Sequence, residues 1–108
     1  MLARVHRIID GDDLRHVSRR GSRSASQYFV VSRQVTQADN PSRFGFVVSK
    51  QVGGAVIRNR VKRRLREMAQ HEISLGFSGE DVVVRALPPA GEATYDELRV
   101  AWDGAFQQ

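Results

Sequence analysis

A dense run of basic side chains from Arg58 to Arg66 is the part of this sequence best suited to chemistry with a ligand. It holds six Lys or Arg residues in nine positions, and Glu67 is the only acid between Lys50 and His71. Guanidinium and ammonium groups donate charge-assisted hydrogen bonds to phosphate oxygens. Like charges this dense destabilise a helix unless a polyanion neutralises them. The run therefore predicts binding to nucleic acid.

The apolar residues within this run predict how a helix would present it. Ile57, Val61, Leu65 and Met68 are spaced four, four and three apart, which places them on one stripe at about 100° per residue. The opposite arc holds Asn59, Lys62, Arg63 and Arg66. Arg58 and Arg64 flank the stripe, where their stems can cover apolar surface. An ordinary solvated face is the competing interpretation, although such faces normally interleave acids.

Residues that could form a protein active site are absent from the sequence pattern. The three histidines lack ligand spacing, and the chain has no cysteine for a thiolate, a metal site or a disulfide. The Gly76–Gly79 turn lacks a full nucleophile elbow, and Ser49 next to Lys50 lacks the rest of a Ser/Lys hydrolase set. The aspartates at 10–13 suit a helix N-terminus better than a metal loop. We expect no catalytic residue and no metal site in the protein itself.

Length and charge distribution limit the classes of protein to which this chain can belong. At 108 residues, we expect one domain over 1–108. Residues 1–72 hold fifteen Lys or Arg and six Asp or Glu, whereas residues 73–108 hold two and six. No apolar run reaches transmembrane length and no signal peptide is visible, so a soluble, cytoplasmic protein with no membrane partner is expected. We also expect the free protein to be a monomer.

The rest of the chain must position the basic run. Residues 1–9 are expected to form a basic N-terminal arm that lies along the surface. Acids at 10–13 and Gly21 bound a first helix that ends near Arg20. Residues 21–26 are expected to be a polar connector, and their Ser/Arg alternation fits a flexible RNA-contacting loop as well as a plain linker. Two strands, Gln27–Val35 and Arg43–Ser49, are expected to form an antiparallel hairpin.

The second half of the chain predicts a helix, a strand and a helix. The basic helix is expected to end near His71 or Ile73, and Asp81–Leu87 is apolar enough to be a central strand. Thr94 should cap a final helix in which Trp102 lies on the core stripe. The order α-β-β-α-β-α indicates an α+β fold, with a small sheet backed by helices.

The stretch Phe46–Glu67 closely resembles the signature of the bacterial ribonuclease P protein component. A strand ending in Ser49-Lys50 is followed by the turn Gly53-Gly54-Ala55-Val56 and by Arg58-Asn59-Arg60-Val61-Lys62-Arg63. The resemblance extends over nearly the whole chain. It includes the first helix, the late strand Asp81–Ala86, and the Arg85-to-Pro88 spacing beside that strand.

This resemblance implies a small α/β sandwich in which the basic helix lies in a left-handed βαβ crossover, against the general rule of handedness. It also implies that a catalytic RNA with bound Mg²⁺ cleaves precursor tRNA to release the 5′ leader. The protein would bind that ribonuclease P RNA and guide the single-stranded leader of precursor tRNA along a cleft. The RNA-binding residues carried over from the motif are Lys50, Arg58, Asn59, Arg60, Lys62, Arg63 and Arg66.

The cleft is where this sequence departs from the family, which typically lines it with aromatic residues. The first-helix positions here are Leu14 and Ser18, and the position near the end of the strand is Ser32. Alternation along the strand should turn either Tyr28 or Phe29 toward the cleft. We therefore expect Leu14, Tyr28 and Phe29 as candidate cleft residues, with binding that depends more on Arg than on stacking.

Two other classes compete with this interpretation. A general RNA-binding or ribosomal-type protein could use the same helix, but it would not distinguish precursor from mature tRNA. A helix-turn-helix DNA-binding module is disfavoured because the basic helix follows a strand and a Gly-Gly turn instead of a partner helix.

Overall fold

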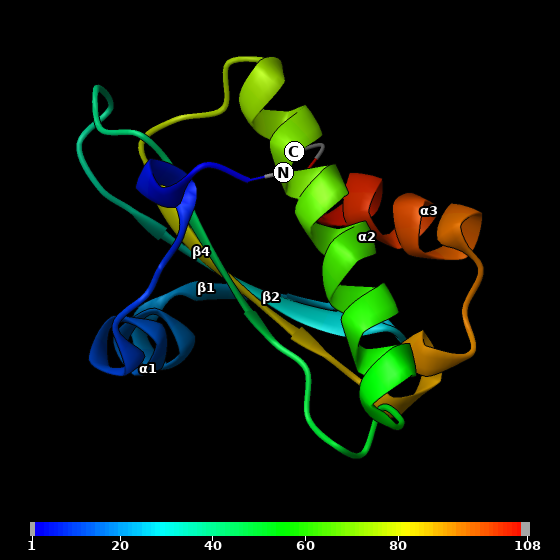
Figure 1. Ribbon diagram of the computed structural model, residues 1–108. Coiled ribbons are helices and arrows are strands. Elements are labelled where there is room, and N and C mark those ends of the chain that lie inside the picture. Colours follow the sequence, from blue (N-terminus) through cyan, green and yellow to red (C-terminus); the bar gives the residue numbers. More distant parts are fainter. Residues whose placement is uncertain (1, 107–108) are drawn as a thin grey trace.

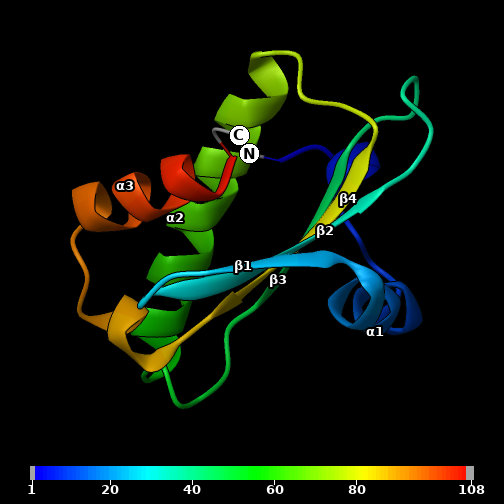
Figure 2. The same cartoon turned by 180° about the vertical axis from the view of Figure 1, so that it is seen from behind.

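A four-stranded mixed sheet separates helix α1 on one face from α2 and α3 on the other (Figures 1 and 2). The computed structural model describes residues 2–106. Its elements, in chain order, are η1 (Arg4–His6), α1 (Gly11–Arg20), β1 (Ser22–Ala25), β2 (Phe29–Val35), β3 (Arg43–Val47), α2 (Ala55–Ser74), β4 (Glu80–Ala86), η2 (Pro88–Gly91) and α3 (Tyr95–Phe106). The expected α+β class is confirmed, and every predicted element is present in the predicted order.

The strand β4 lies inside the sheet, whose order is β1-β2-β4-β3. It pairs antiparallel with β2 and parallel with β3. Val82 and Val84 pack into the core beneath α2 and α3, whereas Val83 packs beneath α1. A strand that is apolar on both faces is stable only where both faces are covered, so the prediction of a central strand is confirmed.

The predicted hairpin between β2 and β3 is wrong, because β4 lies between these two strands. β3 instead joins its parallel neighbour β4 through α2, as a crossover connection. Strands that follow one another in sequence often pair, but here the strand that must be buried on both faces takes the place between them. The left hand of this crossover stays a prediction from the resemblance.

The segment expected to be a polar connector contains the edge strand β1. Arg23 lies opposite Ser32 and Ser24 lies opposite Val31 in its antiparallel pairing with β2. Its side chains are mostly exposed. The backbone of β2 therefore specifies this strand, and no apolar alternation marks it in the sequence.

The N-terminal segment is attached more firmly than a surface arm. Leu2 is 1% exposed within the main core, and Ile8 is buried beneath α1. Arg7 forms a parallel bridge with Phe44 of β3, and the His6 ring is 2.8 Å from the Ser42 carbonyl oxygen. These contacts cover the open edge of β3, which otherwise offers unpaired backbone groups.

The core beneath α2 forms from the predicted helical stripe. Val61, Leu65 and Met68 are fully buried, and the helix begins at Ala55, directly after its N-cap Gly54. Trp102 of α3 is fully buried as predicted, and its ring stacks on Phe106 with centroids 4.6 Å apart. Together these contacts fix the rotation of α2, and so determine which of its side chains face outward.

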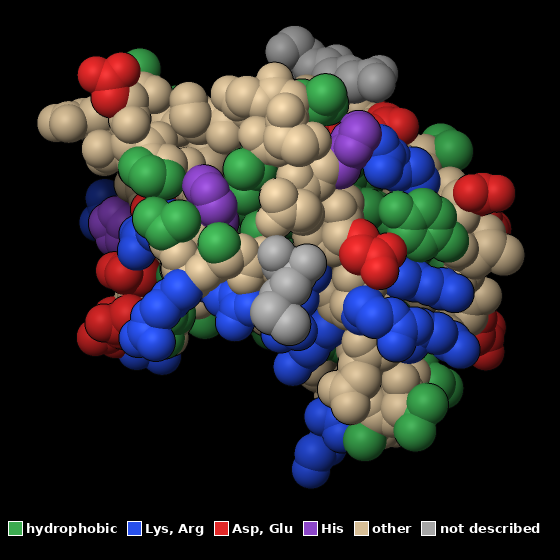
Figure 3. All heavy atoms as spheres, turned by 45° about the horizontal axis from the view of Figure 1, so that its top comes forward, with side chains coloured by type: hydrophobic (Ala, Val, Ile, Leu, Met, Phe, Trp, Pro, Cys, Tyr) green, Lys and Arg blue, Asp and Glu red, His purple; other side chains and the backbone are tan. Residues whose placement is uncertain are grey.

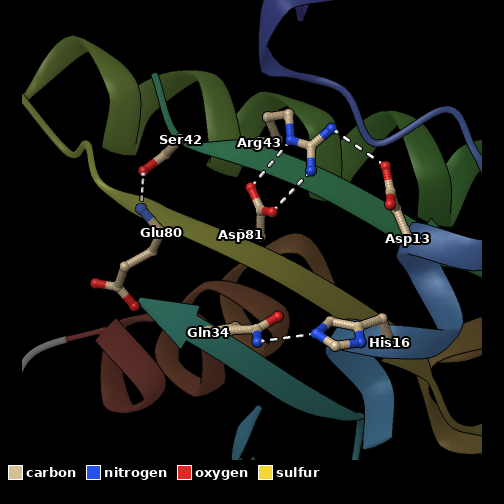
Figure 4. Close-up of polar contacts among 7 residues, drawn as sticks. All are labelled: Asp13, His16, Gln34, Ser42, Arg43, Glu80 and Asp81. Atoms are coloured by element: carbon tan, nitrogen blue, oxygen red, sulfur yellow. Dashed lines mark hydrogen bonds and ion pairs between the residues drawn. The ribbon is translucent and has the colours of Figure 1, made fainter. Parts of the chain in front are cut away.

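Helix α1 is tied to the sheet by a charged contact as well as by packing. The guanidinium of Arg43 on β3 lies between Asp81 of β4 and Asp13 of α1 (Figure 4). Its Nη2 donates to Asp81 Oδ2 at 2.7 Å, and its Nη1 lies 3.5 Å from Asp13 Oδ2. Asp10 caps the helix by accepting from the Asp12 amide.

The start of α3 carries a reciprocal cap whose stability should depend on pH. The Thr94 amide donates to Glu97 Oε1 at 2.9 Å, and the Glu97 amide donates to Thr94 Oγ1 at 3.1 Å. The backbone hydrogen bond from Thr94, followed by the hydroxyl of Tyr28, lowers the pKa of Glu97 below its ordinary value of 4.5. The hydrogen bond to Glu97 raises the pKa of Tyr28 above 10.0.

A depressed carboxyl pKa contributes stability that is present above the ordinary value and lost as pH falls through the folded value. We therefore expect the wild type to lose a small stability increment below pH 4.5 that Glu97→Gln does not lose. The raised pKa of Tyr28 has the opposite sign, since its contribution is lost as pH rises above 10.0. Urea unfolding of both chains across the acidic range measures the first effect, and parallel acid profiles would contradict it.

Candidate nucleic-acid interface

The outward face of α2 is formed by Asn59, Lys62, Arg63 and Arg66, as the helical periodicity predicts. Asn59, Arg63 and Arg66 are exposed and Lys62 is half-buried. Within residues 2–106, none of the three cations forms an ion pair with a carboxylate. Lys and Arg side chains gather in a band across the lower half of the view in Figure 3. Unpaired cations on a rigid helix are suited to contact a phosphate backbone.

Other cations of the same helix form hydrogen bonds within the protein or are shielded from solvent. Arg60 Nη2 donates to the Gly91 carbonyl at 2.9 Å, and Arg64 Nη1 donates to the Ala93 carbonyl at 3.1 Å. Arg58 is half-buried, and its Nε is shielded from solvent. The basic motif therefore divides into side chains that face solvent and side chains that lie along the flanks of the helix.

A groove runs along the sheet face that carries α1. At one end, a hollow of about 150 Å³ is lined by Ser18, Arg23, Val30, Ser32, Val83 and Arg85. A second hollow is lined by Val47, Ser49, Lys50, Gln51, Arg85, Ala86, Leu87 and Pro88. Arg85 lines both hollows, so they adjoin, and we call the two together the α1-side groove.

The register of β2 decides which of the predicted cleft residues can reach this groove. Val30 and Ser32 line it, whereas Phe29 and Val31 point into the opposite core. Phe29 is 1% exposed, so its assignment to the cleft is wrong. The fully covered core beneath α2 and α3 takes the aromatic ring because burial of large apolar surface is most favourable there.

Neither of the other two candidates is among the residues that line these hollows. Tyr28 packs against the core beneath α2 and α3, and its hydroxyl donates to Glu97 of α3 at 3.0 Å. Leu14 is half-buried and packs with Ile8 and Val17 beneath α1. By contrast, Ser18 and Ser32, which stand where the family typically has aromatics, do line the groove.

Arg23, Val30 and Arg85 are among the groove residues that were not predicted as site residues from the sequence. Arg85 had a visible signal, since it is the one charged residue within the apolar run from Val82 to Leu87. Arg23 had a weaker signal, since the Ser/Arg alternation of residues 21–26 also fits a flexible RNA-contacting loop, although the edge strand that carries Arg23 was not predicted. The lining holds cations and no aromatic ring. That leader binding depends on Arg more than on stacking stays a prediction.

Two further arginines, outside α2, form ion pairs with carboxylates inside the protein. Arg33 donates to both carboxylate oxygens of Glu80 at 2.8 Å, and Arg43 is paired with Asp81. These side-chain hydrogen bonds raise the pKa of each guanidinium above its ordinary value. Such locally neutralised arginines differ from Lys62, Arg63 and Arg66, whose charge remains available to a ligand.

Residues 2–106 contain no cluster of three or more His, Asp or Glu side chains that could hold a metal ion. No helix among them is long and apolar enough to span a bilayer.

Comparison with known proteins gives a consistent result. The model of the family "Ribonuclease P" matches residues 2–108. The chain is 48% identical over 106 residues to the ribonuclease P protein component of Beutenbergia cavernae, covering 98% of this chain and 89% of that protein. It is 49% identical over 100 residues to that of a Nocardioides species, covering 91% and 86%.

Solved structures agree with these relatives. The Staphylococcus aureus RNase P protein superposes with a TM-score of 0.85 at 28% identity, covering 94% of this chain and 93% of that one. The Thermotoga maritima RNase P protein gives a TM-score of 0.80 at 26% identity, covering 94% of each chain. The chain belongs to the ribonuclease P protein family, and it is the accessory protein subunit that works with ribonuclease P RNA in removing the 5′ leader of tRNA precursors.

Proposed function

We propose that the two cationic surfaces divide the work of RNA binding. The outward face of α2 contacts ribonuclease P RNA, and the α1-side groove holds the single-stranded 5′ leader of precursor tRNA. One observation carries this proposal: on the outward face of a rigid helix, Arg63 and Arg66 are exposed and Lys62 is half-buried, and none of the three has a carboxylate partner in the described chain. Because the sheet lies between the two surfaces, the protein can contact both RNAs at once.

The groove suits a single strand read by its backbone. Lys50, Arg85 and Arg23 supply cations along it, while Ser18 and Ser32 supply hydroxyls. Arg23 Nη2 also donates to the Ser18 carbonyl at 2.8 Å, which holds its guanidinium at the wall of the groove. Stacking on an aromatic ring is worth roughly 1–3 kcal/mol per base, and the lining offers no ring for it. The leader should therefore be held mainly through phosphate contacts, with weak dependence on its sequence.

The bond-breaking chemistry belongs, in this proposal, to the RNA subunit and its Mg²⁺. The described protein residues do not fit a resident metal, since no cluster of candidate ligands is present among them. We therefore assign the protein the binding and positioning of RNA and no catalytic step. We place the protein in the cytoplasm, where tRNA is transcribed in bacteria, and expect it to be a monomer before assembly.

Neutralising the groove should remove the preference for a leader. With Arg23→Gln and Arg85→Gln combined, we expect the assembled RNA–protein complex to lose about tenfold in affinity for precursor tRNA at about 0.15 M salt, because two single-strand phosphate contacts are lost. Affinity for mature tRNA should stay unchanged. Equilibrium binding of the two tRNAs to wild-type and variant complexes measures this.

The matched control is Arg99→Gln, which removes a cation that is paired with Asp103 on α3. It should leave both affinities at the wild-type level. Equal losses for precursor and mature tRNA in the groove variant would contradict leader binding and would favour the general RNA-binding alternative.

A further inference from the structure

We propose that Arg60 and Arg64 are positioning residues that hold the segment 88–93 against α2, and that they thereby set the shape of the groove mouth. Both belong to the basic run, and Arg60 belongs to the motif that predicts RNA contact. The proposal rests on the proposed function only where leader binding is the readout. Its first experiment uses the free protein.

The hydrogen bonds join one flank of the helix to one short segment. Arg60 and Arg64 are four residues apart and so lie on the same side of α2, one turn from each other. Their guanidinium groups donate to the carbonyls of Gly91 and Ala93, at 2.9 and 3.1 Å. Both arginines are half-buried, and Arg60 Nε is shielded from solvent without a partner. A phosphate outside the protein cannot reach that nitrogen.

Packing at Gly91 shows how closely the segment is held. Gly91 is buried, and a Cβ there would overlap the carbonyl oxygen of Val52 and lie 3.2 Å from Ile57 Cγ2. The segment therefore presses against the turn that leads into α2. Without the two arginines, nothing of comparable strength in the described hydrogen bonds ties residues 91–93 to the helix.

The same two stretches of chain form the mouth of the α1-side groove. Lys50 and Gln51 lie on the turn, Leu87 directly precedes the held segment and Pro88 begins it, and all four line one hollow. A shift of the segment away from α2 would change the spacing of these walls. Arg60 and Arg64 thus link the helix that binds ribonuclease P RNA to the part of the groove that receives the leader.

Hydrogen exchange in the free protein tests the contact directly. In Arg60→Gln we expect the backbone amides of 90–93 to exchange roughly tenfold faster, because a charge-assisted hydrogen bond that restrains the segment is lost. Arg63→Gln, which changes an exposed neighbour on the same helix, should leave these amides at the wild-type rate. Unchanged exchange in Arg60→Gln would overturn the proposal whatever RNA the protein binds.

Binding measurements separate positioning from phosphate contact. Arg60→Gln should keep the wild-type salt dependence of binding to ribonuclease P RNA, while the assembled complex loses roughly three- to tenfold of its preference for precursor over mature tRNA. Arg63→Gln should instead lower the slope of log affinity against log salt by about one. A slope lowered by about one in Arg60→Gln would overturn the proposal, since it would make Arg60 a phosphate contact.

Gly91→Ala supplies a variant that changes no charge. Its Cβ displaces the segment from Val52, so we expect the same faster exchange and the same loss of precursor preference as in Arg60→Gln. Wild-type exchange and preference in Gly91→Ala would overturn the proposal. If Arg60→Gln fails to fold, as judged by circular dichroism, Gly91→Ala and Arg64→Gln carry the same test.

Discussion

Replacing Lys62, Arg63 and Arg66 together by glutamine should lower affinity for ribonuclease P RNA by about a hundredfold at about 0.15 M salt. Each cation that contacts phosphate releases close to one counterion, so three lost contacts should also reduce the salt slope by about three. The fold should be unaffected, because none of the three makes an ion pair within residues 2–106 and all lie opposite the buried stripe. Filter binding over a salt series measures both quantities.

The control for this variant removes two cations that are neutralised on the surface. Arg15 is paired with Asp12, and Arg99 is paired with Asp103. The double variant Arg15→Gln, Arg99→Gln lowers net charge by two and should change the salt slope by much less than one. If control and test variants lose affinity in proportion to their charge alone, overall charge drives binding and the face of α2 has no special role.

Trp102→Ala should cost about 4 kcal/mol of the free energy of unfolding. The ring is fully buried, it packs against Phe29, Phe44 and Phe106, and its Nε1 donates to Glu72 Oε1 at 3.0 Å. Truncation therefore leaves a cavity and an acceptor without its donor. The free energy of unfolding of a typical domain is about 5–15 kcal/mol, so this variant should be close to losing its fold.

The matched control is Val100→Ala on the same helix, where the side chain is 73% exposed. It should cost less than about 0.5 kcal/mol. Urea unfolding followed by circular dichroism compares the two variants, since Trp102 is the one tryptophan and its fluorescence is lost in the test variant. A cost below about 1 kcal/mol for Trp102→Ala would show that α3 does not complete this core.

Helix α2 could be predicted in most of its detail because one chain segment contains the information. Its apolar spacing, its outward arc and its end near Ile73 follow from 3.6-residue periodicity, and the burial of Val61 and Leu65 confirms the predicted rotation. The central place of β4 and the cap at Thr94 also depend on local patterns. Elements of this kind can be predicted without knowledge of the tertiary structure.

The pairing of the strands could not be predicted in the same way. The sequence of β2 and β3 does not encode that β4 will enter between them, and β1 has no apolar face to mark it. The groove depends on these pairings, since Arg23, Ser32 and Arg85 come from three different strands. The sequence leaves the choice between Tyr28 and Phe29 open, because a shift of one residue exchanges the two faces of a strand.

The leader and the RNA subunit are proposed to occupy opposite sides of the sheet. Photo-crosslinking from 4-thiouridine placed in the leader of precursor tRNA, within the assembled complex, tests it most directly. We expect the crosslinked peptides to contain groove residues around Arg23, Ser32, Lys50 or Arg85. Leader crosslinks confined to the outward face of α2, at Asn59 to Arg66, would contradict the account.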